Sequence, residues 1–303
     1  MNQEIGKKLL SVLKVEQVKK DEPMKIHTTF RVGGPASYFV TPETEEEVVK
    51  VIEVCTQENV PYYIVGNGSN LLVSDQGYEG VIIQIYKQMN QVEITENEIH
   101  AQAGALLSMI ANRAMEAELT GFEFAAGIPG TLGGACVMNA GAYGGEMKDV
   151  LETVTVLTRD GDVKTLTKDE LELGYRTSVI AKKDYIVLSA VIRLENGKKE
   201  EIKAVMDDLK EKRITKQPLE YPSAGSTFKR PEGYFAGKLI QDAGLRGFQV
   251  GGAQVSEKHC GFVVNKDQAT AADVMNLMNQ VSDKVYEMSG VRLEPEVKRL
   301  GVF

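Results

Sequence analysis

The pattern of apolar and polar positions predicts a chain that mixes helices with strands. The stretch TEEEVVKVIEVCTQENV starts with Thr44 and Glu47, a spacing typical of a capping box. It then places Val48, Ile52 and Cys55 on one helical face. PYYIV follows as a predicted strand that ends at a glycine, so this part of the chain is predicted to form a β-α-β unit.

The middle of the chain is rich in strand patterns. GVIIQI predicts a strand, NQVEITENEIHAQAG a hairpin, and VTVLTRDGDVKTL a second hairpin with Asp-Gly at its turn. LLSMIANRAMEAEL predicts an amphipathic helix that is closed by Gly121. GYRTSVIAKKDYIVLSAVI is expected to pass straight from Arg176 into a strand.

The last third of the chain predicts two long helices and a strand. The helices are EEIKAVMDDLKEKR and AADVMNLMNQVSDKVYEMS, and the second is expected to start at Thr270 with Asp273 and to stop at Gly290. CGFVVN is the strand. Helices and strands in separate blocks favour the α+β class, and the pattern divides into three segments, 1–65, 66–200 and 201–303.

Composition narrows the class of protein. A chain of 303 residues with 43% hydrophobic and 26% charged residues is typical of a soluble protein with two or three domains. The longest apolar runs are strand-sized and the N-terminal stretch has no apolar signal core, so we expect no membrane association and a cytoplasmic location. The three cysteines and three histidines are scattered, which predicts neither disulfides nor a metal site.

The net charge of −8 argues against a general nucleic-acid surface. Cations nevertheless gather locally, because Arg213, Lys216, Lys229 and Arg230 fall within eighteen residues. Together with the neighbouring GSTF this group favours an anion site, whereas Arg213 alone would be interpreted as a solvated helix end.

Two glycine-rich loops are candidate ligand sites. VGNGSNLLVS lacks both the third glycine of a Rossmann loop, where Leu71 stands, and the Lys-Ser/Thr of a Walker loop. It is therefore either a phosphate cradle of another kind or a plain turn. The second loop, GFEFAAGIPGTLGGACVMNAGAYGG, has eight glycines that would let a flat ligand reach the backbone, and TLGGACVMN predicts a short helix. Its many apolar residues disfavour the alternative, a flexible surface lid.

Six ordered motifs carry a resemblance to a known family. TTFRVGGPA, VGNGSNLLVS, AGIPGTLGGACVMNAGAYG, GYRTS, PSAGSTFKRP and LEPEV resemble the UDP-N-acetylenolpyruvoylglucosamine reductases. The resemblance implies a two-subdomain FAD-binding region of the vanillyl-alcohol-oxidase type, at 1–65 and 66–200, and a smaller α+β substrate-binding domain at 201–303. It also implies tightly bound FAD, NADPH as co-substrate and a monomer that makes UDP-N-acetylmuramate for peptidoglycan. The short GYRTS segment resembles the subtype that lacks an extra tyrosine-bearing loop.

The resemblance implies two sets of binding residues. The expected FAD-binding residues are Gly66, Asn67, Gly68, Ser69, Asn70, Leu71, Gly127, Ile128, Pro129, Gly130, Gly133, Gly134, Asn139 and Gly141. The expected residues for the UDP-sugar substrate are Arg213, Lys216, Lys229, Arg230, Tyr234, Lys258 and His259. Lys298 stands where many relatives have arginine, a departure that keeps the positive charge but loses the bidentate geometry.

The resemblance also implies three catalytic residues, Ser226, Arg176 and Glu296. Hydride from reduced FAD would reach the β-carbon of the enolpyruvyl group, and Ser226 would protonate the α-carbon. An enolate carbon is a strong base, so a serine donor needs no histidine partner, unlike a serine nucleophile. Arg176 would clamp the substrate carboxylate, and Glu296, protonated beside that carboxylate, would stabilise the enolate.

Three other functions remain as alternatives. A flavoprotein oxidase or dehydrogenase on the same scaffold is disfavoured by the GSTFKRP and LEPEV motifs. A serine hydrolase is disfavoured because Ser226 does not lie in a G-x-S-x-G sequence. A non-enzymatic nucleotide-binding module would contain no flavin.

Overall fold

The computed structural model describes residues 3–303, which fold into two compact units. Each unit is assembled from three separate stretches of chain. The first unit comprises Met1–Lys19, Phe39–Asn67 and Val81–Arg213, and the second comprises Lys20–Tyr38, Gly68–Gly80 and Ile214–Phe303.

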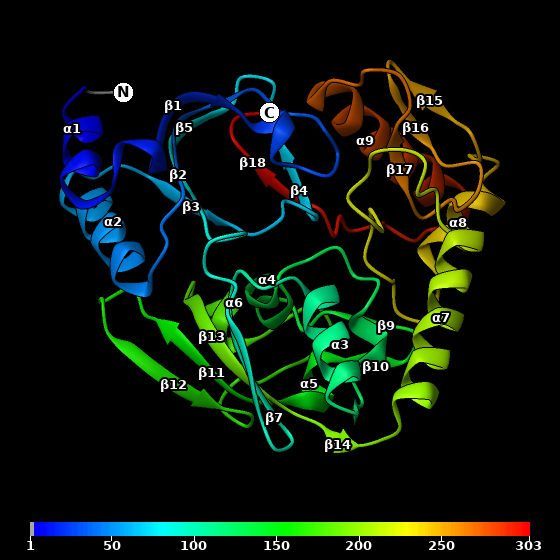
Figure 1. Cartoon of the computed structure of the whole chain (residues 1–303). Coiled ribbons are helices and arrows are strands. Elements are labelled where there is room, and N and C mark those ends of the chain that lie inside the picture. The colour runs from blue at the N-terminus through cyan, green and yellow to red at the C-terminus, as the bar shows by residue number, and fades with distance from the viewer. Residues whose placement is uncertain (1–2) are drawn as a thin grey trace. The chain divides into compact units, whose positions relative to one another are not determined.

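Two helices pack together at the N-terminal end of the first unit (Figure 1). They are α1 (Gln3–Val12) and α2 (Glu45–Gln57), and the predicted apolar face of α2 is buried. Thr44 caps α2 by accepting a hydrogen bond from the Glu47 backbone N (3.1 Å), as predicted. The prediction of a complete capping box is wrong in its second half, in which the Glu47 side chain would accept from Thr44 N. Glu47 Oε2 instead accepts from Glu43 N (2.7 Å) and Gln17 Nε2 (2.8 Å).

A four-stranded sheet has the order β1-β2-β5-β3. Its strands are β1 (Val18–Pro23), β2 (Pro35–Val40), β3 (Tyr62–Val65) and β5 (Tyr78–Gln84). Within the first unit, β3 pairs with β5 in parallel. The strands predicted at PYYIV and GVIIQI are thereby confirmed.

A five-stranded antiparallel sheet of order β12-β11-β13-β7-β6 forms the main layer of the first unit. Its strands are β6 (Val92–Thr95), β7 (Glu98–Gln102), β11 (Leu151–Leu157), β12 (Val163–Thr167) and β13 (Ile186–Arg193). Both predicted hairpins are confirmed, and the Asp-Gly turn has Gly161 at φ 89°. The central strand β13 is mostly buried and α4 (Leu132–Val137), the short helix predicted in the glycine loop, packs against it.

Two predictions about element ends in the first unit are wrong. Helix α3 (Leu107–Glu116) ends before Gly121, because Glu118 adopts a left-handed conformation (φ 58°) and starts the turn into β8 (Leu119–Thr120). The chain after Arg176 forms the helical turn α6 (Val179–Lys182) before it enters β13. The remaining short elements are η1 (Val15–Gln17), η2 (Met24–Ile26), η3 (Glu123–Ala125), β9 (Gly141–Ala142), β10 (Gly145–Glu146), α5 (Met147–Val150) and β14 (Glu195–Asn196).

In the second unit, helix α9 (Ala271–Ser289) packs on the antiparallel sheet β15-β16-β17. The strands are β15 (Gln249–Val250), β16 (Ala253–Val255) and β17 (Val263–Asn265). The start and stop predicted for α9 are both confirmed, since Thr270 and Asp273 form a reciprocal capping box and Gly290 ends the helix at φ 72°. Helix α8 (Ala236–Asp242) also contacts α9, and β18 (Lys298–Leu300) pairs with β4 (Leu71–Val73) in parallel.

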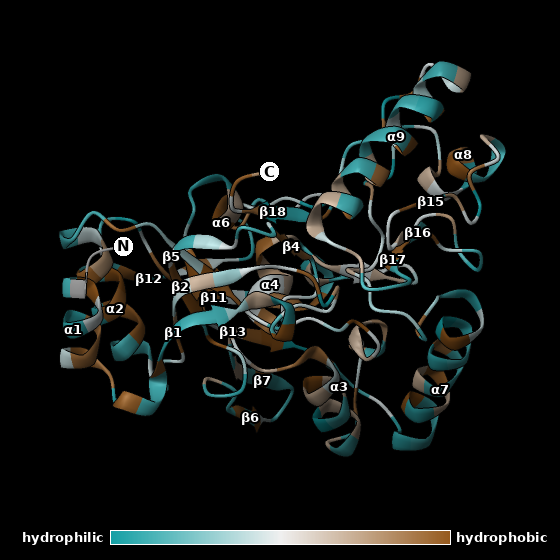
Figure 2. Ribbon diagram, turned by 90° about the horizontal axis from the view of Figure 1, so that it is seen from above, coloured by the Kyte–Doolittle hydropathy of each residue, from teal (hydrophilic) through white to brown (hydrophobic). Residues whose placement is uncertain are grey.

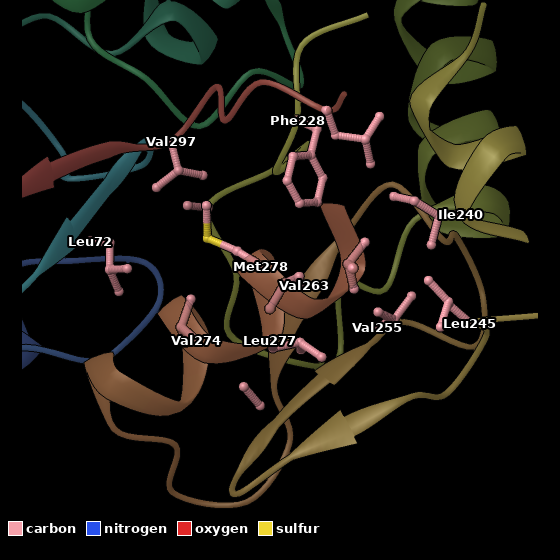
Figure 3. Close-up of a cluster of buried hydrophobic side chains, with 14 of the residues drawn as sticks. Leu72, Phe228, Ile240, Leu245, Val255, Val263, Val274, Leu277, Met278 and Val297 are labelled. Atoms are coloured by element: carbon pink, nitrogen blue, oxygen red, sulfur yellow. The ribbon is translucent and has the colours of Figure 1, made fainter. Parts of the chain in front are cut away.

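One hydrophobic cluster forms the core of the second unit (Figure 3). Phe228 and Val297 both point toward Met278 of α9, and all three side chains are buried. In Figure 2, α9 carries both hydrophobic and hydrophilic segments, as expected of a helix with one buried face. Helix α7 (Lys199–Lys216) is more polar, and Ile202 is its one fully buried residue. Across residues 3–303, none of the helices is long and apolar enough to cross a membrane.

Candidate active site

Ser226 and Glu296 belong to two chain segments that pair in the second unit. Glu296 N donates to Thr227 O (2.8 Å), and Lys229 N donates to Glu294 O (2.8 Å). Glu296 thus bonds the residue next to Ser226, although 70 positions separate Ser226 and Glu296 in the sequence. The structure brings these two predicted catalytic residues together.

The backbone around Ser226 is held by buried neighbours. Thr227 is fully buried (0% exposed); its N donates to Gly261 O (2.9 Å) and its Oγ1 accepts from Val263 N (2.8 Å). Phe228 anchors the next position in the core. Ser226 itself is exposed, and Glu296 is half-buried. Ser226 is therefore an exposed residue on a backbone that two buried side chains fix in place.

The first glycine loop is packed against other parts of the protein. In the first unit, a Cβ at Gly66 would lie 2.3 Å from Thr131 Oγ1, and Asn67 Nδ2 donates to Pro129 O (2.7 Å). These contacts join the two glycine loops to each other. Gly66 is therefore needed for close packing, whether or not a ligand is bound.

The rest of this loop lies in the second unit and connects to Glu296. Gly68 has φ +62°, and a Cβ there would lie 2.1 Å from His27 O, so only glycine fits. Asn70 Nδ2 donates to Glu296 O (3.2 Å), and Asn70 O accepts from Lys298 N (3.0 Å). Leu71 is the first residue of β4, and Ser69 is half-buried between Gly68 and Asn70. The loop predicted to hold FAD thus shares a hydrogen bond with the candidate catalytic glutamate.

The second glycine loop contains glycines of two kinds. A Cβ added at Gly133 would lie 3.0 Å from Ala103 Cβ, and a Cβ added at Gly141 would lie 2.7 Å from Gly145 O. Both glycines therefore allow close packing. Gly127 and Gly134 are exposed, but a Cβ at Gly127 would lie 2.5 Å from Arg213 Nη1, so only Gly134 of these two is open. The nearest atom to a Cβ at Gly134 is 3.8 Å away.

The exposed part of this loop lies in a fixed frame. Pro129 is exposed, Ile128 and Gly130 are half-buried, and Gly130 O accepts from Leu107 N (3.1 Å). Uncovered backbone in such a frame fits a flat ring system such as a flavin.

Arg176 lies at the tip of a tight turn in the first unit. Gly174 and Thr177 exchange two backbone hydrogen bonds (3.1 and 3.3 Å), so Tyr175 and Arg176 form the tip. Arg176 has φ +54°, a left-handed conformation that is uncommon for a residue with a side chain. Its guanidinium lies 5.3 Å from the centre of the Tyr175 ring. The turn presents a permanently charged fork, as a carboxylate clamp requires.

The predicted substrate cations have different surroundings. Lys229 forms an ion pair with Glu294, and the Arg230 guanidinium stacks 4.0 Å from the centre of the Phe235 ring. Lys216 and Tyr234 are exposed. These side chains all belong to the second unit.

Arg213 is not the solvated helix end that its sequence position alone would suggest. Its Nη1 lies 2.5 Å from the position that a Cβ at Gly127 would take, within the first unit. Burial lowers the pKa of its guanidinium, and nearby Tyr143 acts in the opposite direction.

Lys258 lies at a cavity of about 320 Å³ in the second unit. Its Nζ donates to Ile214 O (2.6 Å) and lies 3.9 Å from Glu220 Oε2. The other residues that line the cavity are Tyr221, Gln254, Ser256, Glu257, Val264 and Lys266. Acidic and basic groups are mixed there, so the cavity does not by itself indicate an anion site.

His259 is set up as a neutral hydrogen-bonding group. Burial lowers the pKa of its imidazole; a backbone hydrogen bond partly opposes this shift, and Arg246 acts in the same direction as burial. Its Nδ1 accepts from Gly261 N (3.1 Å), which leaves Nε2 to carry the proton, and the ring packs edge-on against Phe262. His259 would therefore contact a ligand as a hydrogen-bond donor and not as a cation.

This burial predicts a pH dependence of stability. The unfolded chain binds a proton at the ordinary histidine pKa, whereas folded His259 does so only at a lower pH, so the free energy of unfolding should decrease as the pH falls below about 6.5. The slope should stay below the one-proton limit of about 1.4 kcal/mol per pH unit. Denaturant unfolding between pH 7.5 and 5.5 should show a shallower decrease for His259→Gln than for the wild type; equal slopes would contradict the assignment.

The cysteines are not candidates for chemistry. All three are buried, and burial raises the pKa of the Cys55 and Cys136 thiols to about 12 and that of Cys260 above its usual value. Among residues 3–303, no group of three or more His, Cys, Asp or Glu side chains could hold a metal ion.

Comparison with known proteins decides the family. Residues 217–300 match the C-terminal domain of UDP-N-acetylenolpyruvoylglucosamine reductase, and residues 36–167 match an FAD-binding domain. The UDP-N-acetylenolpyruvoylglucosamine reductase of Agathobacter rectalis is 56% identical over 315 aligned positions that cover all of both chains. The chain belongs to the UDP-N-acetylenolpyruvoylglucosamine reductase family. A family member from Clostridioides difficile is 54% identical, with 99% of both chains covered.

Solved structures agree with the family and with the predicted fold class. The crystal structure of the Thermus caldophilus reductase superposes with a TM-score of 0.80 at 37% identity, covering 94% of this chain and 98% of that one. An alkyldihydroxyacetonephosphate synthase matches with a TM-score of 0.51 at 19% identity over 65% of this chain and 41% of that one, a likeness of fold alone. The α+β class with an FAD-binding region of the vanillyl-alcohol-oxidase type is thereby confirmed.

The sequence analysis missed residues that support the family motifs. Thr227 bonds Val263 and Glu296, yet nothing in GSTF distinguishes a structural threonine from an exposed one. Ser178 caps α6, and its place just before the apolar residues VIA is a signal that could have been recognised.

Proposed function

We propose that this protein is an FAD-containing, NADPH-dependent reductase of UDP-N-acetylglucosamine enolpyruvate. Its product would be the lactyl ether of UDP-N-acetylmuramate, for peptidoglycan precursor synthesis. The observation that carries the proposal is the backbone pairing of the Ser226 and Glu296 segments, which are fixed by buried neighbours. A general acid and a charge-stabilising group next to each other are what reduction of an enolpyruvyl group requires.

The two glycine loops would hold FAD, residues 66–71 at its pyrophosphate and residues 127–141 along its ring system. The exposed, open backbone at Gly134, in loops that Gly66, Gly68, Gly133 and Gly141 pack tightly, supports this assignment. When bound, FAD supplies the hydride that it has received from NADPH. The three-part division at residues 65 and 200 belongs to the same proposal.

Ser226 would donate the proton to the α-carbon of the substrate. Ser226 is exposed and stands on a backbone fixed at Thr227, so the donor needs little reorganisation before the reaction. A serine hydroxyl is a weak acid, but an enolate carbon is basic enough to take its proton. This also explains why a serine can act here without a histidine.

Glu296 and Arg176 would stabilise the charge that develops on the substrate. Glu296 next to the substrate carboxylate would be repelled if ionised, so we expect binding to raise its pKa and keep it protonated. In that form it donates a hydrogen bond to the enolate. Arg176 offers two parallel donors to the carboxylate, a geometry that lysine does not provide.

The diphosphate and uridine would contact Arg213, Lys216, Lys229, Arg230, Tyr234, Lys258 and His259. The stacking of Arg230 on Phe235 supports its part in this set, because a stacked guanidinium is already ordered before a phosphate arrives. Lys229 must exchange its ion pair with Glu294 for a ligand. We therefore expect Lys229 to contribute less than Arg230.

The purified protein tests the proposal directly. It should contain FAD, and addition of the enolpyruvyl nucleotide should cause oxidation of one NADPH per substrate reduced, without oxygen. Absorption spectra give the flavin content, and anaerobic loss of NADPH absorbance gives the stoichiometry. Flavin that only oxygen reoxidises would indicate an oxidase, and a protein with no flavin even after refolding with FAD would contradict the proposal.

A further inference from the structure

Asn139 is buried in the second glycine loop, and its side chain is fully engaged with the protein. It is 1% exposed, and its φ of +44° is one that asparagine tolerates better than most residues. Nδ2 donates to Glu146 Oε2 (2.5 Å) and to Gly174 O (3.1 Å), and Oδ1 accepts from Lys148 N (2.8 Å). Both amide hydrogens are thereby used, so the side chain has no donor left for FAD.

Gly174, one of the acceptors of Asn139, is the first residue of the turn that carries Arg176. Its carbonyl also accepts from Thr177 N (3.3 Å), the bond that closes the turn. One carbonyl therefore belongs both to the Arg176 turn and to the anchor in the glycine loop. The Asn139 amide fixes the direction in which this carbonyl points.

The far side of the turn is attached to the same loop. Ser178 is fully buried (0% exposed), and its Oγ donates to Val137 O (2.6 Å) while accepting from Ala181 N (3.1 Å). The turn from Gly174 to Ser178 is thus held at both ends, by Val137, the last residue of α4, and by Asn139, two positions beyond it. All these residues lie in the first unit.

The tip between these anchors is strained. Arg176 adopts a left-handed backbone (φ +54°), which costs free energy for a residue with a side chain and persists only where the surroundings enforce it. The two anchors are contacts that hold the turn at its ends. Without them the turn would relax toward conformations that point the guanidinium elsewhere.

We propose that Asn139 is a positioning residue for Arg176, acting through the Gly174 carbonyl, and not a ligand of FAD. Ser178 supports the same turn from its other end. The loop that is proposed to line the flavin and the arginine that is proposed to clamp the substrate are thereby built as one rigid piece. The inference rests on the proposed role of Arg176, and it replaces the FAD-binding role that the family resemblance implied for the Asn139 side chain.

A double-mutant cycle of Asn139→Ala and Arg176→Ala tests the inference. Asn139→Ala should slow reoxidation of the reduced flavin by the enolpyruvyl nucleotide roughly ten- to a hundredfold, the loss expected from one or two buried hydrogen bonds. Reduction of the flavin by NADPH should stay within about twofold of the wild-type rate, which corresponds to a change of less than about 0.5 kcal/mol in the activation free energy of that step. In the Arg176→Ala background, Asn139→Ala should cost nothing further, because there is no guanidinium left to position.

The outcomes separate the inference from the proposed function. If Arg176→Ala alone leaves reoxidation unchanged, the proposed role of Arg176 fails and the inference fails with it. If Arg176→Ala is damaging and Asn139→Ala costs the same factor in both backgrounds, Asn139 acts independently and only the inference is overturned. Asn90→Ala is the matched control, since Asn90 Nδ2 also donates to a backbone carbonyl (Lys87 O, 2.8 Å) but is exposed. It should change neither half-reaction.

Hydrogen exchange gives a second readout that needs neither substrate nor activity. In Asn139→Ala the amide of Thr177 should exchange faster than in the wild type, while amides of β13 stay as protected as before. Unchanged protection of Thr177 would contradict the anchoring role. If Asn139→Ala does not fold, Ser178→Ala removes the other anchor and replaces Asn139→Ala in the double-mutant cycle. The same pattern of rates is expected. Additive effects of Ser178→Ala and Arg176→Ala would overturn the inference.

Discussion

Ser226→Ala should leave reduction of the flavin by NADPH near the wild-type rate and slow its reoxidation by the enolpyruvyl nucleotide roughly 10²- to 10⁴-fold, the range of general acid catalysis. Ser226 is an exposed residue, unlike its buried neighbour Thr227, so loss of its hydroxyl should remove the proton donor and little else. Stopped-flow absorbance of the flavin separates the two half-reactions.

Ser223→Ala is the control for this experiment. Ser223 lies three positions before Ser226 and takes part in the fold through a backbone bridge to Val264. It should leave both rates unchanged. An equal loss in both half-reactions of Ser226→Ala would show that the serine supports the flavin site as a whole and does not deliver the proton.

Glu296→Ala should slow the same reoxidation step by about 10²- to 10³-fold, as removal of a donor to a developing oxyanion usually does. Glu296→Gln should be less damaging, because a glutamine amide also donates a hydrogen bond and has nearly the same size. The backbone N of residue 296 bonds Thr227 O in either variant, so the pairing with the Ser226 segment should survive. Stopped-flow reoxidation of both variants gives the comparison.

The outcome for glutamine decides what the carboxyl group does. If Glu296→Gln is as slow as Glu296→Ala, hydrogen-bond donation is not enough and the role proposed for Glu296 is wrong. Glu287→Ala, an exposed carboxylate of α9, is the matched control and should react at the wild-type rate.

Elements whose signals lie within a few residues could be predicted from the sequence. Helix α9 has its start and stop at the predicted residues because Thr270, Asp273 and Gly290 act on their own helix. The capping box of α2 was half wrong because Glu47 bonds Gln17, thirty positions away. The end of α3 was missed because Glu118, and not a glycine, adopts the left-handed conformation there. Propensity does not reveal such exceptions.

The candidate site shows the same limit. The family motifs predicted Ser226, Glu296 and Arg176 as catalytic residues, but they contained no information about which groups hold them. The hydrogen bond from Glu296 N to Thr227 O and that from Asn139 Nδ2 to Gly174 O join residues 69 and 35 positions apart. The assembly of each unit from three stretches of chain could not be predicted for the same reason, since it depends on long-range pairing.

A structure of the protein with FAD and the enolpyruvyl nucleotide bound would test the central claim most directly. The account predicts that Ser226 Oγ lies within about 3.5 Å of the substrate α-carbon, or reaches it through one ordered water. A hydroxyl that points away from that carbon, with no water between them, would contradict the mechanism.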